Sequence, residues 1–140
     1  MRTVFADTVY WIAIARPKDP WQDAAKKAHE QLGSVRLVTT DEVLTEFLAA
    51  LSKGGPDLRR TAAKMVRTIL TNANIKVVPQ SRDFFQKGLS HYEARYDKGY
   101  SLQDCISMNV MKSELIVEIL TNDHHFGQEG FTVLMKRDVS

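Results

Sequence analysis

Four carboxylates are the residues of this sequence best suited to chemistry. Asp7 and Asp123 each follow an apolar, strand-like run, whereas Glu46 and Asp104 lie on helix-like segments with an apolar flank. Carboxylates that cluster without basic partners repel one another unless a cation lies among them. Ligand sets made only of oxygen suit magnesium or manganese rather than zinc. We therefore expect these four side chains to meet and to bind Mg²⁺ or Mn²⁺.

Strand patterns that alternate with helix patterns must position these acids. Strands are predicted over residues 3–6, 35–38, 75–78, 115–120 and 131–134. Helices are predicted over residues 8–16, 21–32, 39–53, 58–70, 81–96 and 101–112. This alternation predicts a three-layer α/β/α fold with a central, mainly parallel sheet. Such sheets bind ligands just beyond the carboxyl ends of their strands, where Asp7 and Asp123 are expected.

Length and composition exclude several classes of protein. A chain of 140 residues predicts a single domain over residues 1–140. With 44% hydrophobic and 26% charged residues it is typical of a globular protein, and no apolar run approaches a membrane span. The single cysteine, Cys105, excludes an internal disulfide and a multi-cysteine zinc site. Without a signal-peptide pattern, we expect a cytoplasmic protein.

Each aspartate also has a purely structural interpretation. Asp7 could cap the helix that follows it, and Asp123 could be an Asx-turn residue after a strand. Asp104 stands three residues after Ser101, which is capping-box spacing. However, the helix around Asp104 is apolar on nearly all sides, and an acid in such surroundings needs a partner. The combination of four acids, rather than any single one, therefore carries the prediction.

Glu46 has a rival in Glu42 on the same predicted helix. The apolar arc of that helix consists of Val43, Leu44, Phe47, Leu48 and Leu51. Glu46 lies beside Ala50 at the edge of this arc, closer to it than Glu42 does. Glu42 is explained by the helix dipole and by capping-box spacing from Thr39. We therefore place Glu46 at the site.

Four motifs resemble a PIN domain. They are F-A-D-T from Phe5, D-E-V-L-T-E-F-L from Asp41, S-L-Q-D-C-I-S-M from Ser101 and L-T-N-D-H-H-F-G-Q-E-G-F-T-V-L from Leu120. The resemblance covers nearly the whole chain and implies a metal-dependent endoribonuclease, often the toxin half of a VapBC-type toxin–antitoxin pair. It also implies an RNA substrate, a cognate antitoxin protein and a homodimer. The acidic positions of the family fall on Asp7, Glu46, Asp104 and Asp123, and a family hydroxyl falls on Thr121.

The expected reaction is in-line hydrolysis of an RNA phosphodiester. A metal held by carboxylates orients a water, lowers its pKa and neutralises charge on the scissile phosphate. Direct or water-mediated ligation is expected of the three aspartates, Asp7, Asp104 and Asp123. Glu46 would be a further ligand or would orient the attacking water. Thr121 would position a carboxylate or a bound water, or would be a plain turn hydroxyl.

Other features fit two interpretations each. His124 and His125 have the residue type of metal ligands or of a general base. Because adjacent side chains diverge, they are interpreted instead as turn residues, either solvated or near a substrate phosphate. Arg60, Lys64 and Arg67 at helical spacing indicate an RNA path or a solvated helix face. A net charge of +2 is too small to decide between them.

Two other functional classes compete with a toxin nuclease. One is a PIN-like RNA-processing enzyme, and the other is a protein whose output is binding to a partner. A phosphotransfer domain is not favoured, because the run ending at Asp7 contains one acid and no D-x-D motif.

Overall fold

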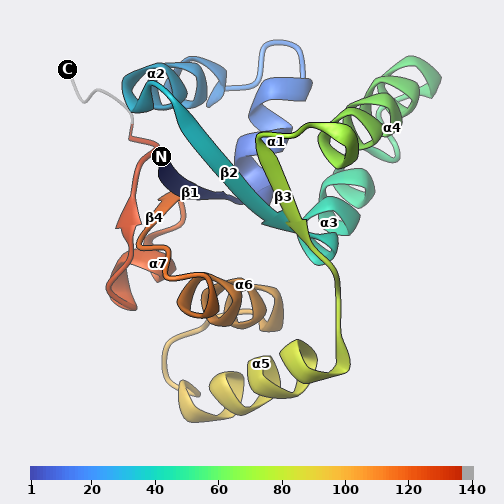
Figure 1. The fold of residues 1–140 in the computed structure, drawn as a ribbon. Coiled ribbons are helices and arrows are strands. Elements are labelled where there is room, and N and C mark those ends of the chain that lie inside the picture. Colours follow the sequence, from blue (N-terminus) through green and yellow to red (C-terminus); the bar gives the residue numbers. More distant parts are fainter. Residues whose placement is uncertain (137–140) are drawn as a thin grey trace.

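Strands and helices alternate along the chain and build one five-stranded sheet (Figure 1). The computed structural model describes residues 1–136. The strands are β1 (Arg2–Ala6), β2 (Val35–Thr40), β3 (Ile75–Val78), β4 (Glu118–Leu120) and β5 (Thr132–Val133). The helices are α1 (Thr8–Ala15), α2 (Gln22–Leu32), α3 (Asp41–Leu51), α4 (Pro56–Thr71), α5 (Arg82–Ala94), α6 (Leu102–Ser113) and α7 (His124–Gln128). Within the described residues, no helix is long and apolar enough to span a membrane.

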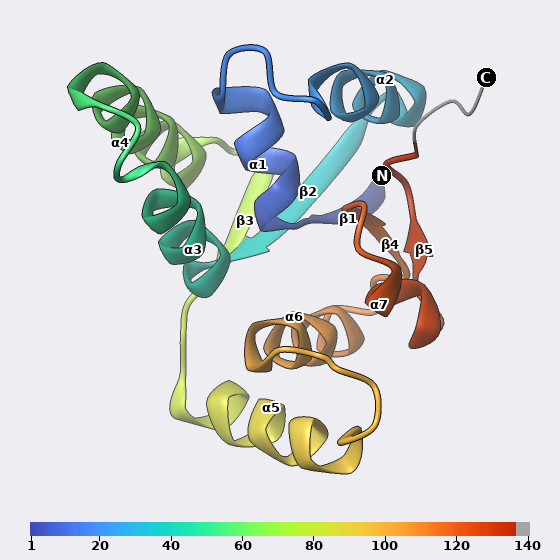
Figure 2. The same cartoon turned by 180° about the vertical axis from the view of Figure 1, so that it is seen from behind.

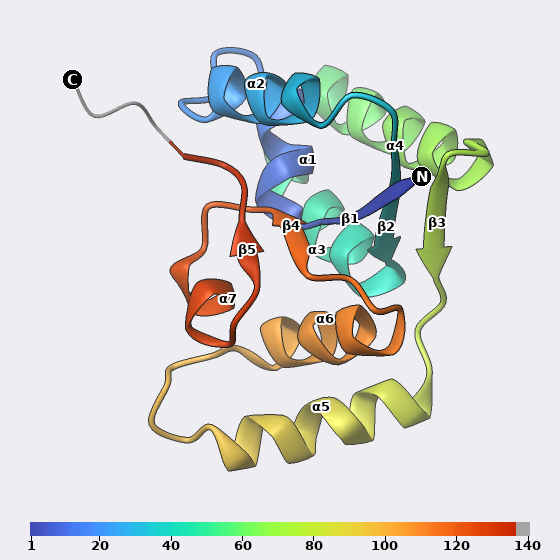
Figure 3. The ribbon, with the colours of Figure 1, turned by 60° about the vertical axis from the view of Figure 1, so that its left-hand side comes forward.

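The sheet has the strand order β3-β2-β1-β4-β5, and every pair of neighbouring strands in it runs parallel. The chain moves outward from β1 to β3 and then crosses back to β4 on the other side of β1. Because parallel crossovers are right-handed, connections that run in opposite directions place their helices on opposite faces. Figure 3 shows α1 to α4 on one side of the sheet and α5 and α6 on the other. The predicted three-layer α/β/α fold is confirmed, and its sheet is entirely parallel over residues 1–136.

The core lies on both faces of β1 and β2. Val4, Phe5 and Ala6 of β1 are fully buried, which is expected of a central parallel strand covered by helices on both sides. Figure 2, the view from behind, shows α1 in front of these strands. On the opposite face α6 contributes the fully buried Met108 and Met111. This packing fixes the carboxyl ends of β1 and β4, from which the candidate site is built.

Two predicted boundaries are wrong for local reasons. β4 begins at Glu118 rather than at Leu115, because Leu115 ends α6 with a positive φ of 59° and is 90% exposed. Its backbone N–H and that of Ile116 donate back to carbonyls of α6, which keeps both residues out of the sheet. The N-cap of α3 is Thr40, whose Oγ1 accepts from the Val43 N–H at 3.0 Å. The predicted Thr39 cap instead belongs to β2.

The predicted apolar stripe of α5 is also wrong in its phase. The sequence pattern over residues 81–96 predicts an apolar stripe of Phe84, Phe85, Leu89 and Tyr92 that faces the core, with a dimer surface as the alternative. The last three side chains are 40%, 42% and 48% exposed. Gly88 is the buried residue of this helix, and a Cβ added there would lie 2.5 Å from Cγ1 of Ile106 in α6. The close approach of α5 to α6 therefore passes through this glycine and turns the larger apolar side chains outward.

Candidate active site

A cavity of about 430 Å³ at the carboxyl ends of β1 and β4 brings the four predicted acids together. We call it the acidic cavity; it is lined by Asp7, Thr8, Val9, Ile12, Glu46, Asp104, Thr121, Asn122, Asp123 and His124. The two neighbours of β1, β2 and β4, are reached by connections on opposite faces, so the strand order reverses here. This is the topological switch point at which open parallel sheets bind ligands.

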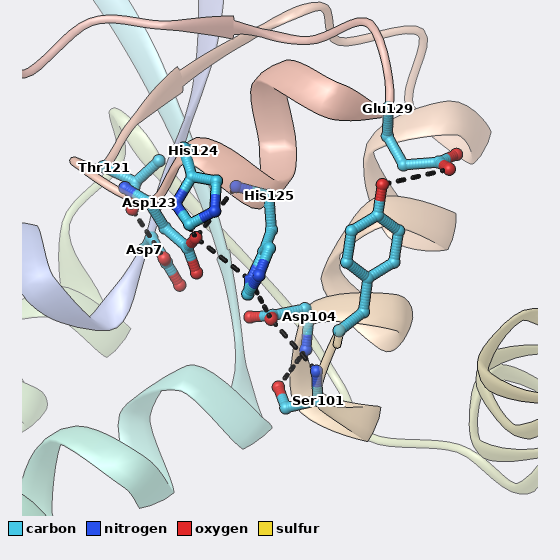
Figure 4. A network of polar contacts seen from close by, with 9 residues as sticks. Asp7, Ser101, Asp104, Thr121, Asp123, His124, His125 and Glu129 are labelled. Atoms are coloured by element: carbon cyan, nitrogen blue, oxygen red, sulfur yellow. Dashed lines mark hydrogen bonds and ion pairs between the residues drawn. The ribbon is translucent and has the colours of Figure 1, made fainter. Parts of the chain in front are cut away.

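Asp7 is the deepest of the four acids. It occupies the N-cap position of α1, but its side chain makes no capping hydrogen bond. Instead its Oδ2 accepts from Oγ1 of Thr121 at 2.9 Å, which joins the ends of β1 and β4 (Figure 4). Burial, together with the charges of Asp104 and Glu46, raises the pKa of Asp7 to about 7 against the opposing hydrogen bonds. A carboxylate held among other carboxylates in this way favours a cation beside it.

Asp104 is both a capping residue and a wall of the acidic cavity. The Ser101 Oγ accepts from the Asp104 N–H at 3.0 Å, and the Asp104 Oδ2 accepts from the Ser101 N–H at 3.1 Å. The capping box predicted as the structural alternative is therefore present. It fixes a half-buried carboxylate at the cavity. Burial, together with the charge of Asp123, raises the pKa of Asp104.

Thr121 connects two of the acids. Its fully buried hydroxyl donates to Asp7 and accepts from the backbone N–H of Asp123 at 3.2 Å. Asp123 in turn uses Oδ1 to accept from the His125 N–H at 2.9 Å, which is the predicted Asx-type contact and begins α7. The hydroxyl contacts match the carboxylate-positioning interpretation of Thr121.

Glu46 lies at the rim of the acidic cavity, one helical turn along α3 from Glu42, which lines a neighbouring cavity. The predicted arc was partly wrong, because Leu48 and Ala50 are exposed, and so is Glu46 itself. The buried stripe consists of Val43, Leu44, Phe47 and Leu51. The position of Glu46 therefore follows from the direction in which α3 crosses the strand ends, not from burial of its side chain.

His125 lies among the site acids, whereas the sequence interpretation set a ligand role aside and expected a turn residue, solvated or near a substrate phosphate. Its Nδ1 lies 3.2 Å from Oδ1 of Asp123 and 3.6 Å from Oδ2 of Asp104, between the two carboxylates (Figure 4). The side chains of His124 and His125 do not diverge: although successive residues of a helix turn by about 100°, their ring centroids lie 4.4 Å apart at the start of α7. The capping pattern of Asp123 before two histidines was the signal that could have indicated this helix.

The donor atoms fit a divalent cation. The carboxylates around the cavity are hard oxygen ligands, and an imidazole stands beside them. One possible ligand atom of each of Asp123, His124 and His125 lies within 4.8 Å of the others. Oγ1 of Thr8 is buried at the same cavity without a hydrogen-bond partner in the structure, although buried hydroxyls are normally paired. A bound cation or its water shell would satisfy both the charge and this hydroxyl.

Fold and site together define an α/β protein with a carboxylate-lined, candidate metal site at its topological switch point. The chain belongs to the PIN domain family, whose family model matches residues 4–130. The predicted family membership is therefore confirmed. A search of curated proteins finds no match.

Two solved structures are similar in fold. The toxin VapC20 of Mycobacterium tuberculosis, described as cleaving the sarcin–ricin loop, matches with a TM-score of 0.79 and 23% identity. That match covers 92% of this chain and 96% of VapC20. FitAcB from Neisseria gonorrhoeae matches with a TM-score of 0.63 and 12% identity, over 94% of this chain and 96% of that one. At these identities the two structures support the fold.

Proposed function

We propose that this protein is a Mg²⁺- or Mn²⁺-dependent endoribonuclease that hydrolyses RNA phosphodiesters. The observation that supports the proposal most strongly is the convergence of Asp7, Glu46, Asp104 and Asp123 on one cavity. Family membership supports the same reaction class. When bound, the cation would supply charge neutralisation at the phosphate and a more acidic water.

The acids and Thr121 have separate roles in this proposal. Asp7, Asp104 and Asp123 hold the cation directly or through water, and Glu46 at the rim is a further ligand or orients the attacking water. Thr121 holds Asp7 and Asp123 at a fixed position relative to each other, because its hydroxyl donates to the Asp7 carboxylate and accepts from the Asp123 N–H. The capping box keeps the Asp104 carboxylate at the cavity wall. These contacts pre-organise the acids, so little rearrangement is needed when substrate binds.

Asp104→Asn tests the proposal. The amide oxygen can still accept from the Ser101 N–H, so the cap and the fold survive, whereas a ligand charge is removed. We expect cleavage of a structured RNA in Mg²⁺ or Mn²⁺ to fall by at least about 100-fold, which corresponds to about 2.7 kcal/mol. The measurement is the initial rate of product formation, with circular dichroism to verify folding. Full activity in a folded Asp104→Asn protein contradicts the site assignment.

A toxin role is the favoured biological setting of this activity. VapC20, which has the same fold, is described as a toxin that cleaves the sarcin–ricin loop. Induced expression of the chain should then arrest bacterial growth, whereas Asp104→Asn should not. A cognate antitoxin, expected from a small reading frame next to this gene, should restore growth and bind the toxin. Light scattering of the protein purified from the cytoplasmic fraction tests the expected homodimer.

Other outcomes identify the competing functions. Metal-dependent cleavage without growth arrest favours an RNA-processing nuclease. A folded protein that binds a partner but cleaves no RNA in either metal favours the binding function instead.

A further inference from the structure

A second cavity adjoins the acidic cavity along α3. It has a volume of about 500 Å³ and is lined by Glu42, Gln80, Ser81, Arg82, Phe85 and Ile106. We call it the α3–α5 cavity. Glu42 in this cavity and Glu46 in the acidic cavity lie on the same side of α3, four residues or about 6 Å apart along its axis. The two cavities are therefore neighbours at the distance of adjacent groups on one ligand.

The α3–α5 cavity combines an aromatic surface with a cation. Phe85 is 40% exposed, although aromatic side chains of this size are normally covered. The guanidinium carbon of Arg82 lies 5.4 Å from the centre of the Phe85 ring, in cation–π geometry. An aromatic face beside a guanidinium is the usual means by which proteins hold an unpaired nucleobase and its phosphate.

Hydrogen bonds hold the wall of the α3–α5 cavity in place. Asp41 at the start of α3 uses Oδ2 to accept from the Gln80 N–H at 3.0 Å, which ties the segment before α5 to α3. Ser81 caps α5 by accepting from the Phe84 N–H at 3.1 Å. Arg82 and Phe85 follow within the first turn of that helix. A wall fixed in this way is pre-organised, so a ligand does not have to order it.

We propose that the α3–α5 cavity is a base subsite, which holds the nucleotide next to the scissile phosphodiester. This inference rests on the proposed ribonuclease function. The base stacks against Phe85, and Arg82 neutralises the adjoining phosphate. Glu42 is an acceptor-only group at the same wall, so it favours the three bases that carry an exocyclic amine, adenine, cytosine and guanine, over uracil, which has none.

A randomised single-stranded RNA pool, digested in Mg²⁺ and in Mn²⁺ and sequenced at its new ends, tests the subsite. The parent should discriminate against uracil, the base without an exocyclic amine, at one position beside the cut. Phe85→Ala should flatten that preference and raise KM by about 5- to 100-fold, the effect of one base that no longer stacks, with kcat little changed. Phe85→Tyr keeps a stacking face and should restore both values. Glu42→Gln should weaken the discrimination against uracil.

Leu89→Ala is the matched control. Leu89 lies one turn further along α5 with 42% exposure, nearly that of Phe85, but it does not line the cavity. It should keep the parent's KM and base preference. If the parent cuts RNA but Phe85→Ala and Leu89→Ala behave alike, the subsite is wrong. Equal rises of KM in both variants would assign the exposed face of α5 to a wider contact with RNA. If the parent cuts neither this pool nor the structured RNA in either metal, the ribonuclease function fails and the subsite with it. If it cuts the structured RNA but leaves the pool intact, the ribonuclease function stands and the subsite for an unpaired base is wrong.

Discussion

At the scale of single residues, the two glutamates of α3 make a sharp comparison. Glu46 lines the acidic cavity and Glu42 the α3–α5 cavity, one helical turn away. Glu46→Gln removes a charge beside Asp7 and should lower kcat by about 10-fold or more. Glu42→Gln should leave kcat within about threefold and act mainly on base preference. Single-turnover cleavage at saturating RNA separates the two effects, and a reversed order would show that Glu42 serves the chemistry.

The raised pKa of Asp7 predicts how the metal-free protein responds to pH. Between the ordinary pKa of 3.8 and the raised pKa of about 7, the folded protein holds a proton that the unfolded chain has released. The contribution of Asp7 to the unfolding free energy should therefore be largest below about pH 4 and fall as pH rises towards 7, by up to about 1.4 kcal/mol per pH unit. Asp7→Asn should remove that contribution. Urea unfolding in chelator at several pH values checks this, and a mutant slope equal to the parent's contradicts it.

At the scale of elements, α4 carries the basic residues that the sequence singled out. Arg60, Lys64 and Arg67 are all exposed, and Arg60 pairs with Asp57 of the same helix at 2.9 Å. If these side chains contact RNA phosphates, replacing all three with Gln should flatten the dependence of log K on log salt. The slope should change by about 0.7–0.9 for each phosphate that the variant no longer neutralises.

A charge-matched variant controls this experiment on α4. Lys18, Lys26 and Arg36 are also exposed but lie away from α4, from α5 and from the acidic cavity, on the segment after α1, on α2 and on β2. Replacing those three with Gln makes the same change in net charge, and the salt slope should stay close to that of the parent. An equal change in both variants would mean that overall charge, not α4, attracts RNA.

Elements set by local sequence could be predicted, and elements set by packing could not. β3 agrees residue for residue because Pro79 stops a short apolar run directly after it. The predicted start of β4 was wrong because Leu115 ends α6 in a left-handed conformation. The β-branched residues that follow it, Ile116 and Val117, gave the segment the sequence pattern of a strand. The phase of α5 depends on the contact of Gly88 with Ile106 in the next helix, and periodicity alone cannot show such a contact.

At the scale of the whole molecule, the sequence located the acids but not the contacts among them. The order of strands and helices predicted that Asp7 and Asp123 share one edge of the sheet, because parallel strands end on the same side. Which hydrogen bonds join them depends on the pairing of β1 with β4, two strands far apart in the chain. The same long-range pairing, with α7, brings His125 between Asp104 and Asp123.

Convergence of four carboxylates couples the site to the stability of the whole fold. Without metal their charges repel, so a cation that binds only the folded arrangement should stabilise it. Mg²⁺ or Mn²⁺ at a hundredfold excess over Kd should add about 2.7 kcal/mol to the unfolding free energy and raise Tm by several degrees. Thermal melts in chelator and in manganese measure the shift, and an equal concentration of a monovalent salt controls for ionic strength.

Asp123→Asn decides whether this residue belongs to the site or only to the turn. An asparagine oxygen can still accept from the His125 N–H and begin α7, since Asn and Asp are equally good caps. The mutant in chelator should therefore be at least as stable as the parent, because a repulsive charge is gone. Its Tm shift in manganese should be clearly smaller. If the parent shows no shift, or the mutant shows the full shift of the parent, Asp123 is a capping residue alone and the acidic cavity does not bind the cation through it.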